Sequence, residues 1–268
     1  MTIQNEIISE LGVKPSINVD DEVEKRVTFL VNYMKNSGCR SYVLGISGGV
    51  DSTTAGRLAQ LAVNRLNKDG YNVAFIAVRL PYGTQRDEAD AQAALTFIRP
   101  DTICTVNIAK ASDEMLIESY YSDSCDSVKK DFVLGNIKAR QRMVAQYSIA
   151  GQLSGLVIGT DHAAEAVMGF FTKFGDGACD LAPLTGLNKR QVRALAERLG
   201  APKTLVHKTP TADLENLYPG KPDEVAYGVT YDQIDDFLEG KKVDADAELK
   251  IIKAYLSTQH KRALPVVP

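Results

Sequence analysis

The sequence lacks several features that mark broad functional classes. Its 268 residues include four cysteines, and these form no C-x-x-C pair, so neither a zinc site nor a disulfide framework is supported. A formal net charge of -3 gives no electrostatic case for binding nucleic acid or an anionic membrane. The first ten residues carry acids where a signal peptide needs bases, and no apolar run is long enough to span a bilayer. These absences predict a cytoplasmic protein without a nucleic-acid or membrane partner.

What is present is the composition of an ordinary globular protein, with 44% hydrophobic and 24% charged residues. β-rich runs alternate with stretches of helical pattern, which predicts parallel βαβ units. The predicted strands are residues 42–46, 71–80, 102–108 and 155–160. The predicted helices are two within residues 1–40, then 53–65, 87–98, 134–153, a helix starting near 161, 187–200, 230–240 and 244–260. In such a sheet the ligand lies beyond the carboxyl ends of the strands.

Residues 47–52, Ser-Gly-Gly-Val-Asp-Ser, join the first predicted strand to a helix. This order places N–H groups and the positive end of a helix dipole at one point, which suits a phosphate. Asp51 is interpreted as a Mg²⁺ ligand, because a carboxylate beside phosphates needs a cation between them. The stretch has neither the lysine of a Walker A loop nor a G-x-G-x-x-G motif. A generic glycine turn is the alternative, and it would explain only Gly48 and Gly49.

Other polar residues follow the later strands. Arg79 and Gln85 stand at the end of the second strand, where Arg79 is either a nucleotide contact or a surface arginine. Glu165 lies one turn after Asp161, which would cap that helix. Glu165 is either a second carboxylate for the metal of Asp51, if their strands are neighbours, or a first-turn acid that complements the helix dipole. The sequence alone leaves both pairs of alternatives open.

Basic residues stand at two predicted helix starts. Lys138, Arg140 and Arg142 cluster near the start of the helix predicted from Leu134, which favours an anionic ligand over a solvated basic face. Lys189 opens the helix of residues 187–200 in the same way. Residues 206–223 are rich in proline, threonine and acids and are interpreted as an active-site lid. His162 is interpreted as a structural histidine.

Several motifs occur in a fixed order between about residues 18 and 262: SGGVDST, VRLPYGTQ, GNIKARQRM, GTDHAAEAVMGFFTKFGDG, LNKRQVR, KTPTADLE and HKR. With these motifs the sequence resembles the ammonia-dependent NAD synthetases, which are PP-loop ATP pyrophosphatases. The resemblance implies a doubly wound parallel sheet with helices on both faces, of the adenine nucleotide alpha hydrolase-like type. It also implies a ligase that adenylates the nicotinate carboxylate of deamido-NAD with Mg-ATP and lets ammonia displace AMP, the last step of NAD biosynthesis.

The resemblance also assigns site residues. The ATP-binding positions are Gly45, Ile46, Ser47, Gly48, Gly49, Val50, Asp51, Ser52, Thr160, Lys189 and Thr211, to which Arg79 and Gln85 are added from their position in the sheet. The deamido-NAD-binding positions are Arg140, Lys173, Asp180, His260 and Lys261. Asp51 and Glu165 are expected to hold Mg²⁺, and Asp51, Lys173 and Lys189 to carry catalysis by positioning and charge.

The resemblance further implies a single synthetase domain over residues 1–268, without a glutaminase domain, so ammonia is expected to be the direct nitrogen donor. It implies a homodimer that shares its deamido-NAD site between subunits. The N-terminal helices, about residues 1–38, are expected to pack on the dimer interface or to swap there.

Two other functions are weighed against this resemblance, and each would require different sequence features. Another PP-loop enzyme, such as a GMP synthetase or a tRNA-modifying enzyme, would need a basic RNA surface or a cysteine pair for sulfur transfer. A non-catalytic nucleotide sensor would not need Asp51, Glu165 and Lys189 together.

Overall fold

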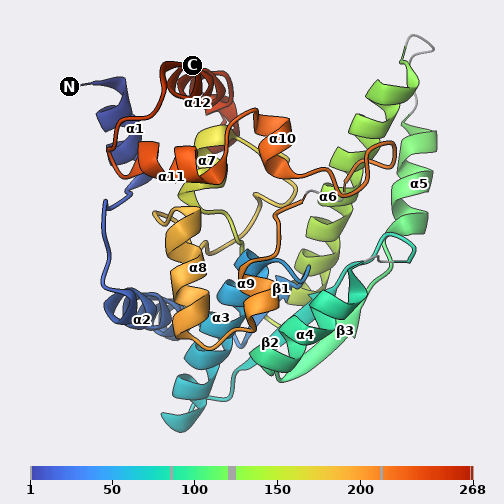
Figure 1. Ribbon diagram of the computed structural model, residues 1–268. Coiled ribbons are helices and arrows are strands. Elements are labelled where there is room, and N and C mark those ends of the chain that lie inside the picture. Colours follow the sequence, from blue (N-terminus) through green and yellow to red (C-terminus); the bar gives the residue numbers. More distant parts are fainter. Residues whose placement is uncertain (1, 85–86, 120–124, 212–213, 266, 268) are drawn as a thin grey trace.

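The computed structural model describes residues 2–84, 87–119, 125–211, 214–265 and 267 (Figure 1). The strands of this described part are β1 (Ser41–Gly45), β2 (Ala74–Arg79), β3 (Thr102–Thr105) and β4 (Gly155–Val157). The helices in its first half are α1 (Ile3–Leu11), α2 (Val19–Ser37), α3 (Val50–Lys68), α4 (Glu88–Ile98), α5 (Ala109–Glu118) and α6 (Ser127–Gln152). Those in its second half are α7 (Ala163–Met168), α8 (Lys189–Arg198), α9 (Lys203–Val206), α10 (Asp223–Tyr227), α11 (Tyr231–Leu238), α12 (Ala245–Ser257) and α13 (Gln259–Arg262). No helix of the described residues has the length and apolar character needed to cross a bilayer.

The strands form one parallel sheet in the order β3-β2-β1-β4. The chain builds β1, β2 and β3 outward in one direction and then returns through α5 and α6 to place β4 on the other side of β1. The strand order therefore reverses between β1 and β4, and in such sheets the ligand crevice opens at that point. The condition set for Glu165, that its strand adjoins the strand before Asp51, is met.

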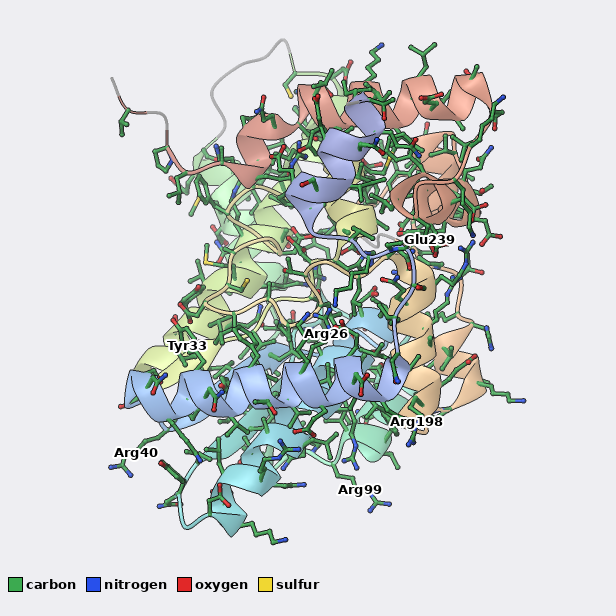
Figure 2. All side chains as sticks on the ribbon, turned by 90° about the vertical axis from the view of Figure 1, so that its left-hand side faces the viewer. Arg26, Tyr33, Arg40, Arg99, Arg198 and Glu239 are labelled. Atoms are coloured by element: carbon green, nitrogen blue, oxygen red, sulfur yellow. The ribbon has the colours of Figure 1, made fainter. Side chains whose placement is uncertain are left out.

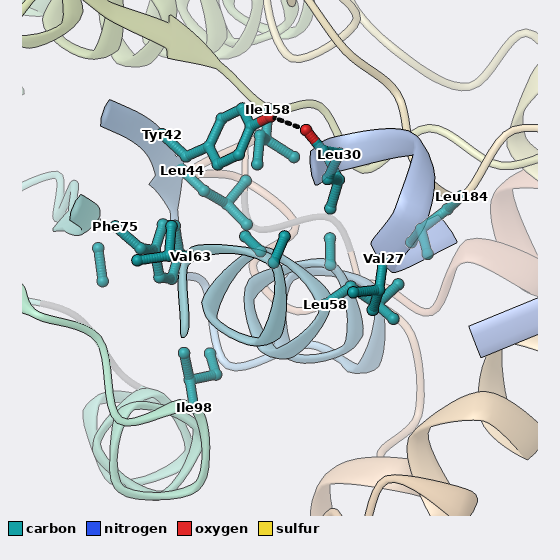
Figure 3. Close-up of a cluster of buried hydrophobic side chains, with 14 of the residues drawn as sticks. Val27, Leu30, Tyr42, Leu44, Leu58, Val63, Phe75, Ile98, Ile158 and Leu184 are labelled. Carbon is teal, nitrogen blue, oxygen red and sulfur yellow. Dashed lines mark hydrogen bonds between the residues drawn. The ribbon is translucent and has the colours of Figure 1, made fainter. Parts of the chain in front are cut away.

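Helices cover both faces of the sheet, as predicted. On one face, α2, α3, α4 and α8 pack against the alternate side chains of β1 and β2, including Tyr42 and Phe75 (Figure 3). The Tyr42 hydroxyl donates to the Leu30 carbonyl of α2 over 2.6 Å, so this buried polar atom is satisfied. On the other face, Val43, Val78 and Val157 pack with residues of α6. We call these two layers and their strands the sheet core.

A second hydrophobic cluster is formed by α1, α7, α11 and α12, at the top of Figure 1, and we call it the terminal-helix cluster. Ile7 of α1 is buried there with Ile234 of α11 and Ile251 of α12. Gln4 adds hydrogen bonds from its amide to the carbonyls of Phe237 (2.8 Å) and Lys241 (3.0 Å). The first helix of the chain is thus held by its last ones. A role for the N-terminal helices at a dimer interface stays a prediction.

The two parts are joined through α2 and the segment before α8. Arg26 points from α2 into the interior in Figure 2 and is only 8% exposed. Its guanidinium pairs with Glu22 (3.0 Å) and donates to the carbonyls of Pro183 and Thr185. This buried arginine fixes the entry to α8, the helix that carries Lys189.

Several element boundaries differ from the prediction, and three of them bear on the site. α6 begins at Ser127 because the Asp126 carboxylate caps it by accepting from the Lys129 N–H over 2.8 Å. Lys138, Arg140 and Arg142 therefore lie well inside α6, and the argument that placed them near a positive helix end is wrong. α7 is capped by His162 rather than by Asp161, and α3 already starts at Val50.

Candidate active site

The loop between β1 and α3 has the shape of a phosphate cradle. Gly48 adopts φ +83°, and a Cβ at this position would lie 2.7 Å from the Ala91 nitrogen of α4, so only glycine fits. The Ser47 and Ser52 hydroxyls lie 3.1 Å apart, and the Gly49 N–H donates to Ser47 Oγ over 3.3 Å. Gly49 is the N-cap of α3 and supplies no capping side chain, so the first turn presents its N–H groups to a ligand.

Gly45 and Ile46 precede this cradle, and their N–H groups are used within the protein. The Gly45 N–H donates to Gln146 Oε1 of α6 over 2.7 Å, and the Ile46 N–H donates to the Val78 carbonyl of β2 over 2.9 Å. These bonds anchor the start of the loop to both of its neighbours. Any contact of Gly45 or Ile46 with a ligand must therefore use atoms other than these N–H groups.

Four charged or titratable side chains meet beside the cradle. Lys189 Nζ lies 2.8 Å from Asp51 Oδ2 and 3.2 Å from His162 Nε2. His162 Nε2 in turn lies 3.3 Å from Asp51 Oδ1 and 3.6 Å from Glu165 Oε1. Asp51 comes from α3, His162 and Glu165 from the start of α7, and Lys189 from the start of α8. The predicted partnership of Asp51, Glu165 and Lys189 is thus present in the structure.

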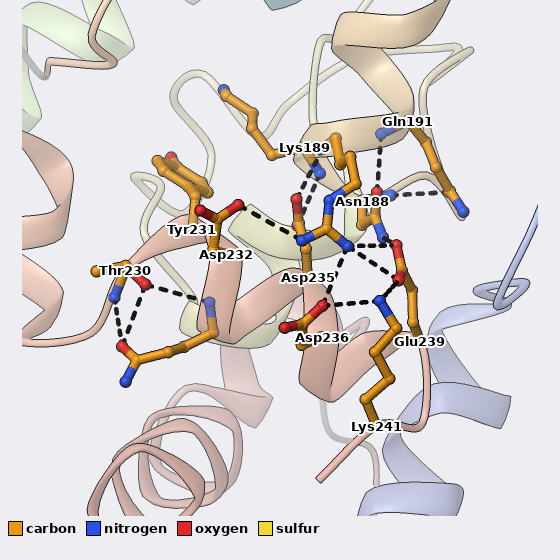
Figure 4. Close-up of polar contacts among 12 residues, drawn as sticks. Asn188, Lys189, Gln191, Thr230, Tyr231, Asp232, Asp235, Asp236, Glu239 and Lys241 are labelled. Atoms are coloured by element: carbon orange, nitrogen blue, oxygen red, sulfur yellow. Dashed lines mark hydrogen bonds and ion pairs between the residues drawn. The ribbon is translucent and has the colours of Figure 1, made fainter. Parts of the chain in front are cut away.

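Lys189 is held in place by a polar network at the N-terminus of α8 (Figure 4). Asn188 and Gln191 form a capping box, and the two oxygens of Asp235 accept from the Lys189 N–H (3.0 Å) and the Arg190 N–H (2.7 Å). Burial raises the pKa of Asp235 to about 6, in opposition to these two N–H donors. The Lys189 side chain is 1% exposed and runs beneath the Tyr231 ring, 5.0 Å from its centroid. Its ammonium is thus held next to Asp51 and His162.

The surroundings shift the pKa values of the two carboxyls, Asp51 and Glu165, in opposite directions. Burial alone would raise the pKa of Asp51, but Lys189 and His162 outweigh it and hold that pKa well below its usual range. Burial raises the pKa of Glu165 to about 8 against the field of His162, and the charge of Asp51 adds to the rise. The two carboxyls of the site therefore differ in how strongly their surroundings favour the ionised form.

The residues present fit a divalent cation. One ligand atom from each of Asp51, His162 and Glu165 lies within 4.8 Å of the others. Asp51 Oδ1 is buried and forms no hydrogen bond, although the His162 ring lies 3.3 Å away, while Asp51 Oδ2 accepts from Lys189. Two carboxylates next to a phosphate cradle are the hard oxygen ligands that Mg²⁺ prefers.

The remaining residues predicted to bind ATP differ in how buried they are and in the partners they contact. Arg79 is 2% exposed, and its guanidinium forms two 2.7 Å bonds to the Glu88 carboxylate of α4. Thr160 follows β4 at the crevice, half-buried, and Thr211 is exposed and bridges to Pro222. Gln85 lies outside the described residues.

The residues predicted to bind deamido-NAD fall into separate groups. Arg140 donates to the Lys173 carbonyl over 3.2 Å, which brings these two together. Lys261 donates to the carbonyls of Gly169 and Phe171, both over 2.8 Å, and the neighbouring His260 is exposed. Both oxygens of Asp180 are used within the sheet core, by the Val157 N–H (2.7 Å) and the Tyr147 hydroxyl (3.4 Å).

Sequence reasoning undervalued His162 and did not identify Asp235. His162 caps α7, as a structural histidine would, yet its other ring nitrogen faces Asp51 and Lys189. Its place directly after the last strand of the crevice was the available signal. Asp235 lies 46 positions after Lys189, and no local pattern indicates that pairing.

Asp161 also faces a space that the sequence did not indicate. A cavity of about 120 Å³ lies behind His162 and is lined by Glu10, Leu11, Asp161, His162, Ala163, Ala166, Thr185 and Gly186. Burial, followed by the charges of Asp176 and Asp51, raises the pKa of Asp161 to about 7.

Comparison with known proteins gives a consistent result. A family model described as NAD synthase matches residues 22–265. The NH3-dependent NAD+ synthetase of Paraburkholderia phytofirmans is 58% identical over 267 residues, which cover 99% of this chain and 93% of that relative. The solved NAD+ synthetase of Burkholderia pseudomallei has a TM-score of 0.84 and 56% identity, with coverage of 98% of this chain and 96% of that one. The solved NMN synthetase of Francisella tularensis has a TM-score of 0.81 and 35% identity, with coverage of 94% and 99%.

These likenesses extend over nearly the whole chain, and the family match at residues 22–265 spans the segments that build the site. They confirm the predicted adenine nucleotide alpha hydrolase-like fold and the resemblance that the motifs carry. The chain belongs to the NAD synthase family.

Proposed function

We propose that the chain is an ammonia-dependent NAD synthetase, a ligase that converts deamido-NAD to NAD with ATP and ammonia. The observation that carries this proposal is the meeting of Asp51, Glu165 and Lys189 beside the Ser47–Ser52 cradle. A nucleotide sensor would have no use for a buried lysine and two carboxylates at the phosphates. The rival sulfur-transfer enzymes need a cysteine pair, whereas the four cysteines of this chain are all free and separate.

The first step joins two anions. The nicotinate carboxylate attacks the α-phosphorus of ATP, the bond to the β-phosphate breaks, and pyrophosphate leaves as the acyl-adenylate forms. The N–H groups at the start of α3 and the Ser47 and Ser52 hydroxyls hold the phosphates, and Lys189 offsets the charge on the side of Asp51. Mg²⁺, held by Asp51 and Glu165, would supply the further positive charge that leaving pyrophosphate needs.

The second step is the attack of ammonia on the activated carbonyl carbon. The C–O bond to the phosphate breaks, AMP departs, and the nitrogen loses a proton to give the amide of NAD. The chain acts here by position and charge, with Lys173 and Lys189 as the catalytic cations. Ammonia itself is the nitrogen donor.

The other proposed contacts follow the residues set out above. For ATP they are Gly45, Ile46, Gly48, Gly49, Val50, Arg79, Gln85, Thr160 and Thr211, with Arg79 sharing its guanidinium with Glu88. For deamido-NAD they are Arg140, Lys173, Asp180, His260 and Lys261. The exposed sides of Arg140, Lys173 and His260 are available to a large dinucleotide, while Asp180 contributes through the strand end that it holds.

We further propose a cytoplasmic homodimer whose deamido-NAD site is shared between subunits. α6 leaves Val144 48% exposed, and Leu153 just after it is 45% exposed, while Phe29 and Tyr33 of α2 are each 42% exposed. These apolar side chains favour a second copy as their cover. Arg140 lies one turn before Val144 on the exposed side of α6, at the edge of that surface.

The test is NAD formation by the purified chain from deamido-NAD, ATP and ammonium, with pyrophosphate–ATP exchange dependent on deamido-NAD as the readout of the first step. Nicotinate mononucleotide is the comparison substrate, because a relative of 35% identity is an NMN synthetase. We expect a higher kcat/KM for deamido-NAD, activity with ammonium that glutamine alone does not match, and loss of activity with EDTA that Mg²⁺ restores. Exchange without either pyridine nucleotide, or equal rates with glutamine, would contradict the proposal.

A further inference from the structure

β4 turns away from β1 just before the cradle begins. The last hydrogen bond between the two strands runs from the Ile158 N–H to the Val43 carbonyl over 2.9 Å. Ile158 also bridges to Leu181, and the Gly159 N–H then donates to the Leu181 carbonyl over 2.8 Å. In a continuing parallel ladder the Gly45 N–H would be the next donor from β1 to β4. The divergence of β4 therefore leaves a backbone donor of β1 without a partner strand.

A side chain of α6 takes the place of that strand. Gln146 Oε1 accepts from the Gly45 N–H over 2.7 Å. The Ile46 N–H donates to β2 over 2.9 Å, and successive N–H groups of a strand point to opposite sides, so the Gly45 N–H points to the side of β4. Gln146 thus bonds to β1 on the side that β4 has left.

The orientation of the Gln146 amide is determined at both of its ends. Its nitrogen donates to the Arg142 carbonyl, one turn earlier on α6, over 3.3 Å. Because an N–H only donates and a carbonyl only accepts, exchanging the amide oxygen and nitrogen would lose both bonds. Gly45 leaves room for this amide, since a Cβ there would lie 3.3 Å from Gln146 Oε1 and 3.1 Å from Leu80 Cδ1.

Arg142 makes a corresponding contact with the neighbouring strand. Its Nε donates over 3.1 Å to the carbonyl of Leu80, the first residue after β2. Arg142 and Gln146 are four residues apart, so they lie on the same face of α6. One helix therefore bonds to the carboxyl ends of β1 and β2, at the edge of the sheet where the cradle begins.

Gly45 lies two residues before Ser47, the first residue of the cradle. The Ser47 hydroxyl lies 3.1 Å from that of Ser52 and accepts from the Gly49 N–H over 3.3 Å. Gly48 has no room to move toward α4, because even a Cβ there would lie 2.7 Å from the Ala91 nitrogen. A displacement of Gly45 is therefore passed to the hydroxyls and N–H groups of the cradle.

We propose that Gln146 is a positioning residue for ATP: its side-chain oxygen replaces the diverging strand β4 and holds the start of the cradle in the position that binds the phosphates. This inference rests on the proposed placement of the ATP phosphates in the cradle. Without the Gln146 acceptor, the Gly45 N–H must find another partner, and the end of β1 shifts toward it. A cradle that must be brought back into place on binding loses part of the binding free energy, so ATP binds more weakly.

The experiment compares Gln146→Met with Gln152→Met. Methionine has a similar length but offers only a weak acceptor. Gln152 is the matched control, because it also lies on α6 and its amide nitrogen donates to a carbonyl one turn earlier, that of Ser148, over 3.0 Å. We expect the KM for ATP to rise about tenfold in Gln146→Met. The KM for deamido-NAD should stay nearly constant, because none of its proposed contacts lies in the cradle, and Gln152→Met should leave both constants unchanged.

Amide hydrogen exchange, followed by NMR, separates this role from a general loss of stability. In Gln146→Met the Gly45 N–H should exchange about tenfold faster than in wild type, whereas the Ile46 N–H, which is bonded to β2, should keep its rate. A general loss of stability would accelerate both amides. Gln146→Asn, whose amide is one methylene short of Gly45, should behave in the same way, and it takes the place of Gln146→Met if that variant does not fold.

An unchanged KM for ATP despite faster exchange at Gly45 would overturn the inference. An unchanged exchange rate at Gly45, or an equal acceleration of the Gly45 and Ile46 amides, would overturn it as well. Failure of the proposed function is distinguishable from these outcomes, because wild type would then form no NAD.

Discussion

The sheet core and the terminal-helix cluster are built in opposite ways. In the sheet core, strands and helices that follow one another in sequence pack together, as β1, α3 and β2 do. In the terminal-helix cluster, α1 packs with α11, whose residues lie more than 200 positions later. The charged site forms where the two meet, since Asp51 comes from the sheet core and Glu165 from α7 of the terminal-helix cluster. The geometry of the charged site therefore depends on the relative placement of two cores, and neither contains the whole site.

The largest expected effect on activity comes from neutralising the carboxylates at the place where the two cores meet. Asp51→Asn and Glu165→Gln should each lower kcat by about 10²-fold or more, because each removes charge from the ligand set that stabilises leaving pyrophosphate. The measurement is kcat for NAD formation at saturating substrates, with Asp246→Asn on α12 as a control expected to retain wild-type activity. A near-normal rate in Glu165→Gln would return that residue to the role of a first-turn acid.

The next test asks whether the sheet cores of two subunits contribute to the same site. Asp51→Ala and Arg140→Ala should each be inactive alone, whereas a mixture of the two should recover about a quarter of wild-type activity, because random exchange makes half the dimers mixed and half of their sites intact. The assay is NAD formation after subunit exchange, followed over time. No recovery despite free exchange would mean that Arg140 acts within its own subunit or that the site is not shared.

A smaller effect is expected at Asp235, which belongs to α11 and holds the start of α8. Its folded pKa of about 6 exceeds the ordinary 3.8, so between these values the native state binds more protons than the unfolded state. The stability that Asp235 contributes must therefore fall as the pH rises from about 4 to about 6, by up to about 3 kcal/mol. Urea unfolding of wild type and Asp235→Asn across this range tests the sign, and a rise in the stability of wild type relative to the variant with increasing pH would contradict it.

The smallest effects compare one tyrosine from each core. Tyr42→Phe removes a hydroxyl that donates to the Leu30 carbonyl, and should lower the free energy of unfolding by about 1 kcal/mol. Tyr231→Phe removes a donor to the Asp223 carboxylate (3.0 Å) and should lower it by about 2 kcal/mol, because the acceptor is a buried carboxylate. The free energy of unfolding is measured by thermal or urea unfolding. Equal decreases in the two variants would show that the buried carboxylate acceptor adds nothing over the carbonyl acceptor.

Much of the sheet core could be predicted from sequence, because its information is local. Buried strands read as β-rich runs, and the glycines of residues 47–52 mark the turn that holds the cradle. The start of α6 was placed too late because Asp126 is one polar residue among many in residues 119–130, and nothing local shows that its side chain is the cap. That error moved Lys138 to a helix end and hid its actual partners, Leu214 and Asn216.

The terminal-helix cluster was less predictable, because its contacts depend on distant segments. An amphipathic helix such as α1 has an apolar face in its sequence, but the pattern does not say that the face meets α11 and α12. Asp235 likewise has meaning only after α11 is placed against the start of α8. Asp51, Glu165 and Lys189 could be named from motifs, whereas the place of His162 in the charged site and the network that holds Lys189 required the structure.

The packing of α1 in the terminal-helix cluster has a consequence for the order of folding during synthesis. A ribosome releases α1 first, and the cluster that buries Ile7 is incomplete until α7 and then α11 and α12 have emerged. The β1 to β3 layer can pair well before that, so the nascent chain passes through a stage with an assembled sheet and an exposed N-terminal apolar helix. Chaperones that bind short apolar helices should find their target at this stage, and Asp51 meets Glu165 and Lys189 only after the later helices have been translated.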